Sequence, residues 1–332
     1  MKVLAIGDRF IPAEFMEAGL KKLREKGFQV DVREWKHATL TELQRDNLLV
    51  EQKGPEAIDL PEELAKGIEE YEIIVVQFFP LNKRTIEQAK NLKYICVLRS
   101  GTENIDCAYA EAQGIEILNT LGRNARAVAE FTIGMILAET RNISRAHAAL
   151  KAGEWRKDFP NSDAIPELYE KTIGLVGFGN IGRLVAYYFQ AFGSKVQVYD
   201  PYIKEAPKGV ALVSLEELLK TSDVVSVHAR LSDETYHLIG EKEFALMKPN
   251  AIFVNTARSG LVDEAALIRT LENKQIMGAA IDVFDKEPIG SDHPYVKLDN
   301  ITLAPHLAGS TRDAFANSPK MMADHLVKKF AW

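Results

Sequence analysis

The stretch Gly177-Phe178-Gly179-Asn180-Ile181-Gly182 decides the fold of this chain. An apolar run over residues 173–176 precedes it, and apolar side chains at helical spacing follow it as far as Phe192. Residues 195–199 form the next predicted strand, and Asp200 stands directly after them. A Gly-x-Gly-x-x-Gly turn between a strand and a helix, followed by an acid about 20 residues later, is the fingerprint of dinucleotide binding.

The three glycines of this turn have different expected roles. The first makes the tight turn, the second lets the backbone approach a pyrophosphate, and the third allows the helix to pack closely on the strand. The N-terminus of the helix adds free N–H groups and a partial positive charge for the phosphates. The alternative is a glycine-rich turn that binds no ligand.

The acid at position 200 indicates which dinucleotide is bound. A carboxylate at this strand end accepts hydrogen bonds from both ribose hydroxyls of NAD and would repel the additional phosphate of NADP. Pro201 and Tyr202 follow Asp200, with no arginine directly beside it. We therefore expect NAD as the cofactor, and the alternative is an exposed aspartate in an ordinary turn.

Length and charge limit the classes of protein that this sequence can form. A chain of 332 residues exceeds the usual size of a single core, so two domains are expected. Hydrophobic residues make up 46% of the chain and charged residues 27%, as in ordinary globular proteins. The net charge of −6 disfavours a general binder of nucleic acid or of anionic membranes.

Neither a membrane segment nor a metal site is expected. No apolar run reaches the roughly 20 residues that span a bilayer, and residues 1–7 lead directly into a strand rather than a signal peptide. Cys96 lies in an apolar run, so we expect a buried thiol and not a disulfide or a nucleophile. No Cys and His residues have the spacing of a metal site. These features predict a cytoplasmic protein.

Strands and helices alternate along the first part of the chain. Strands are predicted over residues 2–6, 28–32, 72–77, 94–98 and 115–118. Helices are predicted over residues 12–26, twice within residues 40–70, and as one long helix over residues 125–153. Alternating strands and helices indicate a parallel sheet with helices on both faces.

A second alternating series follows the glycine-rich turn. Its later strands are predicted over residues 224–228, 251–255, 277–281 and 301–304. The tail from Thr311 is predicted to be helical but interrupted at Pro319, with Ser318 as the N-cap of a restarted helix. In a doubly wound sheet the ligand lies beyond the carboxyl ends of the strands. The candidate site residues that follow predicted strands are Arg99, Asp200, His228, Arg258, Asp282 and His306.

Three further segments carry a family resemblance. They are residues 255–263 (NTARSGLVD), 278–288 (GAAIDVFDKEP) and 304–311 (APHLAGST). Together with residues 177–182, and in this order, they closely resemble the NAD-dependent D-isomer-specific 2-hydroxyacid dehydrogenases, in particular the phosphoglycerate dehydrogenase-like members. The resemblance extends over nearly the whole chain and is clearest between the strand before Arg99 and Thr311.

The resemblance implies three catalytic residues. His306 matches the family's acid/base, which protonates the developing alkoxide on reduction and removes the hydroxyl proton on oxidation. A histidine suits this role because the ordinary pKa of an imidazole lies near neutral pH. Glu287 matches the partner that hydrogen-bonds this histidine and fixes its orientation. Arg258 matches the residue that pairs with the substrate carboxylate, because a guanidinium is always charged and offers a fork of donors.

The resemblance also implies the cofactor contacts. Asn180 and Ile181 should present backbone N–H groups to the pyrophosphate, and Asp282 matches an acid that contacts the nicotinamide carboxamide. Thr256 and Ala257 should line the side of the nicotinamide ribose. The residues predicted to bind NAD are Gly177, Gly179, Asn180, Ile181, Gly182, Asp200, His228, Ala229, Thr256, Ala257, Arg258, Asp282, His306 and Ala308.

The substrate loop departs from the usual family pattern. Residues 99–106 match the loop that offers backbone N–H groups to the substrate carboxylate, so Arg99, Ser100 and Gly101 are predicted to bind substrate. Arg99 replaces a glycine that many members carry. The charges of Arg99 and Arg123 point to a substrate with a second anionic or a polyhydroxylated end. The alternatives are an ordinary strand-to-helix turn and two solvated arginines.

The family has a discontinuous substrate domain. The resemblance therefore implies a flavodoxin-like α/β substrate domain formed by residues 1–118 and 307–332, with an NAD-binding domain inserted as residues 119–306. The inserted domain should contain a Rossmann-type doubly wound parallel sheet. Family members typically associate through the cofactor domain, so we expect a homodimer or homotetramer.

Two classes of function remain open. The first is an NAD-dependent D-2-hydroxyacid dehydrogenase, with phosphoglycerate, glyoxylate or hydroxypyruvate, and sugar-derived acids as candidate substrates. The alternative is a non-catalytic NAD-sensing binding protein, like the relatives that act as transcriptional corepressors. Formate dehydrogenase-like chemistry is disfavoured, because that branch has Gln where this chain has Glu287. The sequence leaves the substrate, the direction of the reaction and the oligomeric state open.

Overall fold

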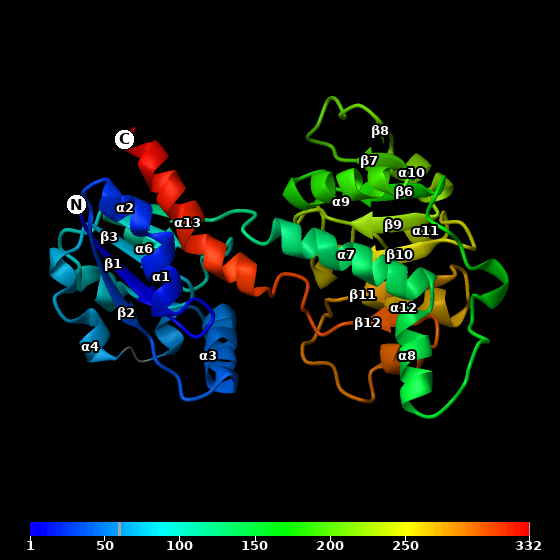
Figure 1. Cartoon of the computed structure of the whole chain (residues 1–332), viewed down its shortest axis with the longest axis horizontal. Coiled ribbons are helices and arrows are strands. Elements are labelled where there is room, and N and C mark those ends of the chain that lie inside the picture. The colour runs from blue at the N-terminus through cyan, green and yellow to red at the C-terminus, as the bar shows by residue number, and fades with distance from the viewer. Residues whose placement is uncertain (59–60, 332) are drawn as a thin grey trace. The chain divides into compact units, whose positions relative to one another are not determined.

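The computed structural model describes residues 1–58 and 61–331, and the chain divides into two compact units. The first unit comprises Met1–Asn124 and Ser310–Trp332, and the second comprises Ala125–Gly309. In Figure 1 the red C-terminal helix lies against the blue N-terminal helices of the first unit. One unit is therefore built from both ends of the chain. The boundaries lie a few residues beyond the predicted ones, which follow residues 118 and 306.

The first unit contains a five-stranded parallel sheet with the order β2-β1-β3-β4-β5. This is the order of the flavodoxin-like doubly wound fold. Along β1, Val3 and Ala5 join one buried cluster, whereas Leu4 and Ile6 join another on the opposite face. The strands are β1 (Lys2–Gly7), β2 (Gln29–Glu34), β3 (Ile73–Val76), β4 (Tyr94–Val97) and β5 (Glu116–Asn119).

Helices cover both faces of this sheet, which explains why its inner strands β1, β3 and β4 are mostly apolar. The helices that pack on the face of Val3 and Ala5 are α1 (Ala13–Gly19), α2 (Lys21–Glu25) and α13 (Arg312–Lys329). Those that pack on the opposite face are α3 (Leu40–Lys53), α4 (Glu62–Ala65), α5 (Lys83–Gln88) and α6 (Cys107–Ala112). Two short 3-10 turns, η1 (Pro55–Ala57) and η2 (Ile68–Glu70), flank α4.

The second unit contains a seven-stranded parallel sheet with the order β12-β11-β10-β9-β6-β7-β8. The chain first runs outward from β6 to β7 and β8, and then returns to place β9 on the other side of β6. This reversal is the topological switch point at which doubly wound sheets bind dinucleotides. The strands are β6 (Thr172–Val176), β7 (Lys195–Tyr199), β8 (Val210–Leu212), β9 (Val224–Val227), β10 (Ile252–Asn255), β11 (Gly278–Ile281) and β12 (Ile301–Leu303).

Helices again cover both faces. One face carries α7 (Ala125–Thr140) and α9 (Asn180–Ala191), and the other carries α10 (Leu215–Thr221), α11 (Glu241–Phe244) and α12 (Glu264–Glu272). The remaining elements are α8 (Ile143–Lys151), η3 (Ser162–Ala164), η4 (Ser259–Leu261) and η5 (Pro294–Lys297). The predicted fold class, two parallel α/β sheets of which one has Rossmann-type order, is confirmed. No helix within the described residues has the length and apolarity needed to cross a membrane.

Two predicted helices are each divided into two. The helix predicted over residues 12–26 breaks at Leu20 between α1 and α2, and the one predicted over residues 125–153 breaks between α7 and α8. Asn142 at the second break has a φ of 57°, a left-handed conformation that asparagine tolerates. Its side chain donates to Asn161 Oδ1 at 2.6 Å, which fixes the turn. The edge strand β8 was not predicted, since three mostly exposed residues carry no periodicity.

The predicted interruption at Pro319 is wrong. Helix α13 is continuous, Thr311 is its N-cap, and Ser318 lies inside it, where its hydroxyl donates to the Ala314 carbonyl at 2.6 Å. Proline removes one helical hydrogen bond. The close packing of its ring on α1 offsets this loss: a Cβ on Gly19 would lie only 2.5 Å from the Pro319 Cβ.

Candidate active site

The glycine-rich turn between β6 and α9 is shaped by two close backbone contacts. Gly177 has a φ of +98°, and a Cβ there would lie 2.6 Å from the Ala229 nitrogen. A Cβ on Gly182 would lie 2.3 Å from the Gly177 carbonyl oxygen. Gly179 differs, since a Cβ there would meet no described atom within 4 Å. Packing within the protein therefore requires glycine at 177 and 182, and the open side of Gly179 fits the close approach of a ligand.

The N-terminus of α9 faces this turn. Gly179 occupies the N-cap position, and the first amide in the helix that bonds back to it is that of Arg183, at 3.1 Å from the Gly179 carbonyl. The amides of Asn180, Ile181 and Gly182 precede that bond and belong to the first helical turn, whose N–H groups have no helical partner. The turn therefore offers the donors and the partial charge that suit a pyrophosphate.

Asp200 is fixed at the end of β7, beside the same turn. Its Oδ2 accepts the Phe178 N–H at 2.8 Å, and its Oδ1 accepts the Tyr202 N–H at 2.9 Å. Each carboxylate oxygen has a second lone pair. The carboxylate is thus oriented by the backbone and still able to accept hydrogen bonds from ribose hydroxyls.

His306 and Glu287 form a hydrogen-bonded pair. The distance from His306 Nδ1 to Glu287 Oε2 is 2.7 Å, and Glu287 Oε1 accepts the Phe284 N–H at 3.0 Å. The two side chains are 47% and 34% exposed, so a ligand can reach the imidazole. Because Glu287 engages Nδ1, the other ring nitrogen, Nε2, is the one oriented for exchange of a proton with a ligand.

Asp282 holds the turn that carries His306. This aspartate is fully buried after β11; its Oδ1 accepts the Leu307 N–H at 2.8 Å and its Oδ2 the Ala308 N–H at 2.9 Å. Its carbonyl oxygen also accepts the His306 N–H at 2.9 Å. Burial raises the pKa of Asp282, and the two backbone donors oppose that rise. His306 has a φ of 54°, so these bonds stabilise an uncommon backbone conformation.

Arg258 lies exposed after β10, the neighbour of β11 in the sheet. Its Nη1 donates to the Ala257 carbonyl at 2.7 Å. Asn255 shapes this turn by donating to the Arg258 carbonyl at 2.9 Å and accepting the Ala257 N–H at 3.0 Å. Arg258, Asp282 and His306 thus follow three adjacent strands, β10, β11 and β12, at one edge of the sheet.

His228 is placed to act as a neutral group. Its Nε2 lies 3.0 Å from Ser226 Oγ, and its Nδ1 is buried without a hydrogen-bond partner among residues 1–58 and 61–331. Burial lowers the pKa of His228 to about 4. The ring is therefore uncharged at neutral pH, and it follows β9, next to Gly177.

Comparison with known proteins shows the family of this chain. Residues 133–308, more than half of the chain, match the family described as D-isomer specific 2-hydroxyacid dehydrogenase, NAD binding domain. The chain belongs to this family. The predicted family is therefore confirmed, and the second unit contains the family's NAD-binding domain.

Individual family members are similar over most of this chain. D-3-phosphoglycerate dehydrogenase of Methanocaldococcus jannaschii is 41% identical over 273 residues, 80% of this chain and 51% of that protein. Hydroxypyruvate reductase of Thermotoga maritima is 41% identical over 256 residues, 76% of this chain and 83% of that protein. The structure of a D-2-hydroxyisocaproate dehydrogenase superimposes with a TM-score of 0.77 at 27% identity, covering 99% of this chain and 97% of that one.

The chain spans about half the length of the phosphoglycerate dehydrogenase that it matches. The family match and the named relatives give no support to the alternative of a non-catalytic, corepressor-like protein. Among residues 1–58 and 61–331, no group of three or more His, Cys, Asp and Glu side chains is arranged to hold a metal ion.

The predicted substrate loop of this family member lies in the first unit and is held by local contacts. The Arg99 guanidinium stacks over the Phe78 ring at 3.9 Å and forms an ion pair with Glu103 at 3.1 Å. The Ser100 carbonyl accepts the Asn119 side-chain amide at 2.9 Å. Arg123, the other predicted arginine of this unit, lies with its guanidinium over the ring of a phenylalanine on α13.

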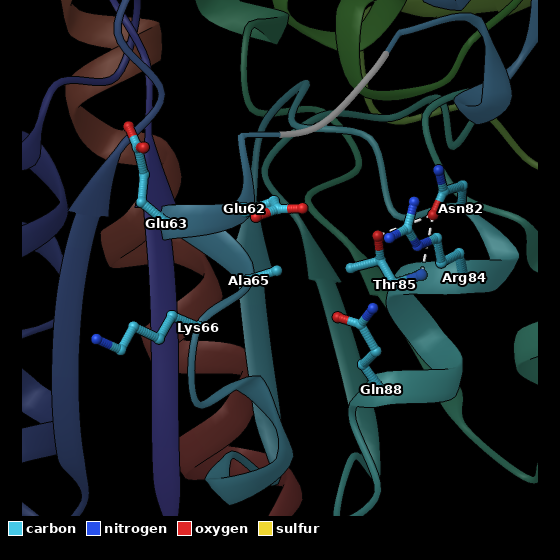
Figure 2. A pocket seen from close by; sticks show the side chains of 8 residues that line it. All are labelled: Glu62, Glu63, Ala65, Lys66, Asn82, Arg84, Thr85 and Gln88. Atoms are coloured by element: carbon cyan, nitrogen blue, oxygen red, sulfur yellow. Dashed lines mark hydrogen bonds between the residues drawn. The ribbon is translucent and has the colours of Figure 1, made fainter.

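A recess in the first unit is separate from these residues. It has a volume of about 770 Å³ and lies between α4 and α5 of the first unit, as Figure 2 shows. Charged and polar side chains line it, and none of the residues predicted for catalysis or for cofactor binding is among them. Its lining residues are Glu62, Glu63, Ala65, Lys66, Asn82, Arg84, Thr85 and Gln88.

Sequence reasoning missed the residues that support the site from elsewhere in the chain. Thr256, predicted to line the nicotinamide ribose, lies 2.7 Å from the hydroxyl of Thr132 on α7. Thr132 also donates to the Val128 carbonyl at 2.7 Å, so Thr256 must be the donor in the pair of hydroxyls. No local pattern marks Thr132, because it belongs to an ordinary buried helical face.

Proposed function

We propose that the protein is an NAD-dependent oxidoreductase that transfers a hydride between NAD(H) and a D-2-hydroxy acid/2-keto acid pair. The observation that carries this proposal is the His306–Glu287 pair at 2.7 Å, held by Asp282 at the edge of a doubly wound sheet. A dinucleotide site and a general acid/base at one sheet edge provide what hydride transfer with proton transfer requires.

The NAD site comprises the glycine-rich turn, the first turn of α9 and Asp200. Bound NAD supplies the hydride acceptor, or the donor as NADH, in the reaction. The open side of Gly179 gives the pyrophosphate access to the backbone. The Asp200 carboxylate accepts hydrogen bonds from the ribose hydroxyls and repels the additional phosphate of NADP. His228 and Ala229 lie beside this turn. Thr256 and Ala257 follow β10 and Ala308 follows β12, and we assign these three residues to the nicotinamide end of the cofactor.

His306 and Glu287 handle the proton. During oxidation, Nε2 of His306 takes the proton from the substrate hydroxyl while Nδ1–H donates to Glu287. The carboxylate stabilises the imidazolium that forms, because it accepts a charge-assisted hydrogen bond. During reduction the same imidazolium returns the proton to the developing alkoxide.

Arg258 binds the substrate. Its guanidinium pairs with the carboxylate of the 2-hydroxy acid and polarises the carbonyl of the 2-keto acid. The bond to the Ala257 carbonyl and the Asn255 contacts limit the positions that the side chain can occupy. In the first unit, the proposed substrate domain, Arg99, Ser100 and Gly101 form the loop that we assign to the substrate.

The cellular location and the oligomeric state are also inferred. We infer a cytoplasmic protein, supported by the free thiols of Cys96 and Cys107. We also infer a homodimer or homotetramer, supported by the region around α8, where Ile143, Leu150 and Trp155 are 55%, 56% and 81% exposed. Light scattering of the purified protein in solution measures its mass and tests this assignment.

NADH absorbance tests the catalytic assignment. The parent protein should reduce NAD in the presence of D-2-hydroxy acids, and His306→Gln should lower kcat by roughly 10²–10⁴-fold. His325→Gln, an exposed histidine on α13, is the matched control and should retain parental activity. Absence of turnover with phosphoglycerate, glycerate, lactate and sugar acids, despite NAD binding, would refute the proposal.

A further inference from the structure

The loop that carries Glu287 is anchored by a carboxylate outside the predicted site. The irregular segment between β11 and η5 ends with residues 285–293, which we call the Glu287 loop. Glu264 is the first residue of α12, and its Oε2 accepts the Asp285 N–H at 3.3 Å. Its Oε1 lies 3.3 Å from Nε2 of His293. One side chain therefore contacts both ends of this loop, with Glu287 between them.

The hydrogen bonds of His293 determine which ring nitrogen carries the proton. Nδ1 accepts the Tyr295 N–H at 3.3 Å, so Nδ1 holds no proton. The proton of the ring therefore lies on Nε2, which donates to Glu264. Tyr295 is buried, and its ring centre lies 5.0 Å from that of His293. The imidazole thus joins η5 to α12, and the Glu264 carboxylate is the acceptor of the bond that joins them.

This carboxylate stands on a well-packed helix. Asp263 caps α12 by accepting the Ala266 N–H at 2.9 Å, and the following turn buries Leu267. The side chains of Glu264 and His293 are only 17% and 18% exposed, so neither is a freely solvated group. A carboxylate accepts hydrogen bonds at both of its oxygens, whereas an amide has one oxygen and one N–H2 group. The two converging donors therefore require an acid at position 264.

Two carboxylates hold consecutive backbone N–H groups where the Glu287 loop begins. Glu287 Oε1 accepts the N–H of Phe284, and Glu264 Oε2 accepts that of Asp285. The other oxygen of Glu287 lies 2.7 Å from His306 Nδ1. A displacement of Asp285 would move the neighbouring donor that orients the Glu287 carboxylate, and this carboxylate in turn orients the imidazole. Glu264 can therefore affect His306 without touching it.

We propose that Glu264 is a positioning residue, which together with His293 fixes the Glu287 loop so that Glu287 holds His306 in the orientation for proton transfer. This inference rests on the proposed function and adds two residues to its acid/base machinery. A displacement of about 1 Å can lower a rate roughly 100-fold. We expect a smaller effect from the loss of Glu264, about tenfold in kcat, because the contact between Glu287 and Phe284 remains.

A double-mutant cycle in the full chain tests the proposal. Glu264→Gln places an N–H2 group against one of the two donors. The kcat should fall about tenfold, while KM for NAD and for the D-2-hydroxy acid that the parent oxidises fastest stays within about twofold of the parental value. In a Glu287→Ala background the same change should lower kcat by less than about twofold, because the carboxylate through which Glu264 acts is absent. A merely structural residue would act equally in both backgrounds.

Two substitutions of His293 separate the anchor from the stability of η5. His293→Gln places an N–H2 group near the position of Nε2 and should keep kcat within about twofold of the parental value. His293→Asn keeps an acceptor near the position of Nδ1 but is too short to reach Glu264, so kcat should fall about threefold at a nearly parental Tm. Glu272→Gln, exposed at the other end of α12, is the matched control and should change neither kcat nor Tm.

A parental kcat in Glu264→Gln, or an equal fall of kcat in both backgrounds, would overturn the positioning role and leave the dehydrogenase proposal intact. Crystal structures of the parent and of Glu264→Gln keep the two proposals apart if no acid is oxidised. Loss of the Glu287–His306 contact in the variant would then support the positioning role and refute the dehydrogenase. A contact retained at the parental distance would overturn both.

Discussion

Two glycine-to-alanine substitutions in the glycine-rich turn should affect different properties: Gly182→Ala should lower thermal stability, and Gly179→Ala should weaken NAD binding. Gly182→Ala places a Cβ 2.3 Å from the Gly177 carbonyl oxygen, and the backbone must move to relieve this contact. Overpacking of this kind costs about 1–3 kcal/mol. For a domain of this size, each kcal/mol lowers Tm by roughly 2–4 °C, so we expect a fall of about 2–12 °C.

Gly179→Ala should leave the Tm of the ligand-free protein nearly unchanged. Gly179 has a φ of −77°, and its Cβ would meet no described atom within 4 Å. The methyl group instead occupies the side from which the pyrophosphate approaches the backbone. The methyl group should prevent one or two charge-assisted hydrogen bonds to the pyrophosphate. Each is worth about 1.5–3 kcal/mol, so the loss of one weakens NAD binding by roughly 10–150-fold.

Thermal unfolding without ligand and calorimetric titration with NAD measure the two effects separately. An alanine at 179 that binds NAD with the parental Kd would refute the assignment of this turn to the pyrophosphate. An alanine at 182 with the parental Tm would refute the packing account. The contrast matters because, if both substitutions only destabilised the turn, Tm and the affinity for NAD would fall in both variants.

Three further outcomes follow from buried groups. Asp282→Asn makes an amide nitrogen face one of the two backbone N–H groups that follow His306, so the free energy of unfolding should fall by about 2 kcal/mol and kcat should fall at least about tenfold. The control Asp285→Asn, at an exposed position, should change neither quantity. Urea unfolding measures the first and steady-state kinetics the second. Burial lowers the pKa of His228 to about 4, so its NMR ring signals should not shift between about pH 5 and pH 8, and a midpoint near 6.5 would contradict its burial. Burial raises the pKa of Asp8 to about 6 from 3.8, so the folded protein keeps a proton that the unfolded chain loses, and unfolding free energy should fall by roughly 3 kcal/mol as pH rises from about 4 to about 6. Asp8→Asn should remove this part of the slope in urea unfolding across that range, and an unchanged slope would show that the carboxyl titrates normally.

The sequence predicted the fold of the second unit and the places of its candidate residues after strands, for a physical reason. Parallel strands end at one edge, so residues that directly follow strands are brought together whatever their separation along the chain. Arg258, Asp282 and His306 are such residues, and the structure places them after three neighbouring strands. The His306–Glu287 contact, at 2.7 Å, joins residues only 19 positions apart.

Contacts between distant segments could not be predicted in this way. Thr132 and Thr256 are 124 positions apart, and each is an unremarkable residue in its own segment. Pro319 lies inside a helix because Gly19, at the other end of the chain, leaves room for its ring. The break at Asn142 depends on a partner from the following loop.

The surroundings of two residues that follow strands in the first unit were missed for another reason. Asp8 follows a strand, as the candidate residues do, but no family motif surrounds it. That its buried Oδ2 has no hydrogen-bond partner in the described part of the chain becomes visible only when its neighbours are known. The charge of Arg99 was visible in the sequence, whereas its ion pairs with Glu51 and Glu103 were not predicted.

The dependence of the first unit on α13 also governs how the chain can mature on the ribosome. Its buried cluster joins Val3 and Met16 with Met322 and Leu326, which are synthesised after the whole of the second unit. The contiguous second unit can fold as soon as it has emerged, because domains fold as units during synthesis. Until α13 has been synthesised, the apolar residues of the N-terminal strands have no helix α13 to pack against, and exposed apolar segments of this kind bind chaperones. Translation that stops before α13 would therefore release a folded NAD-binding domain that bears an unfolded companion.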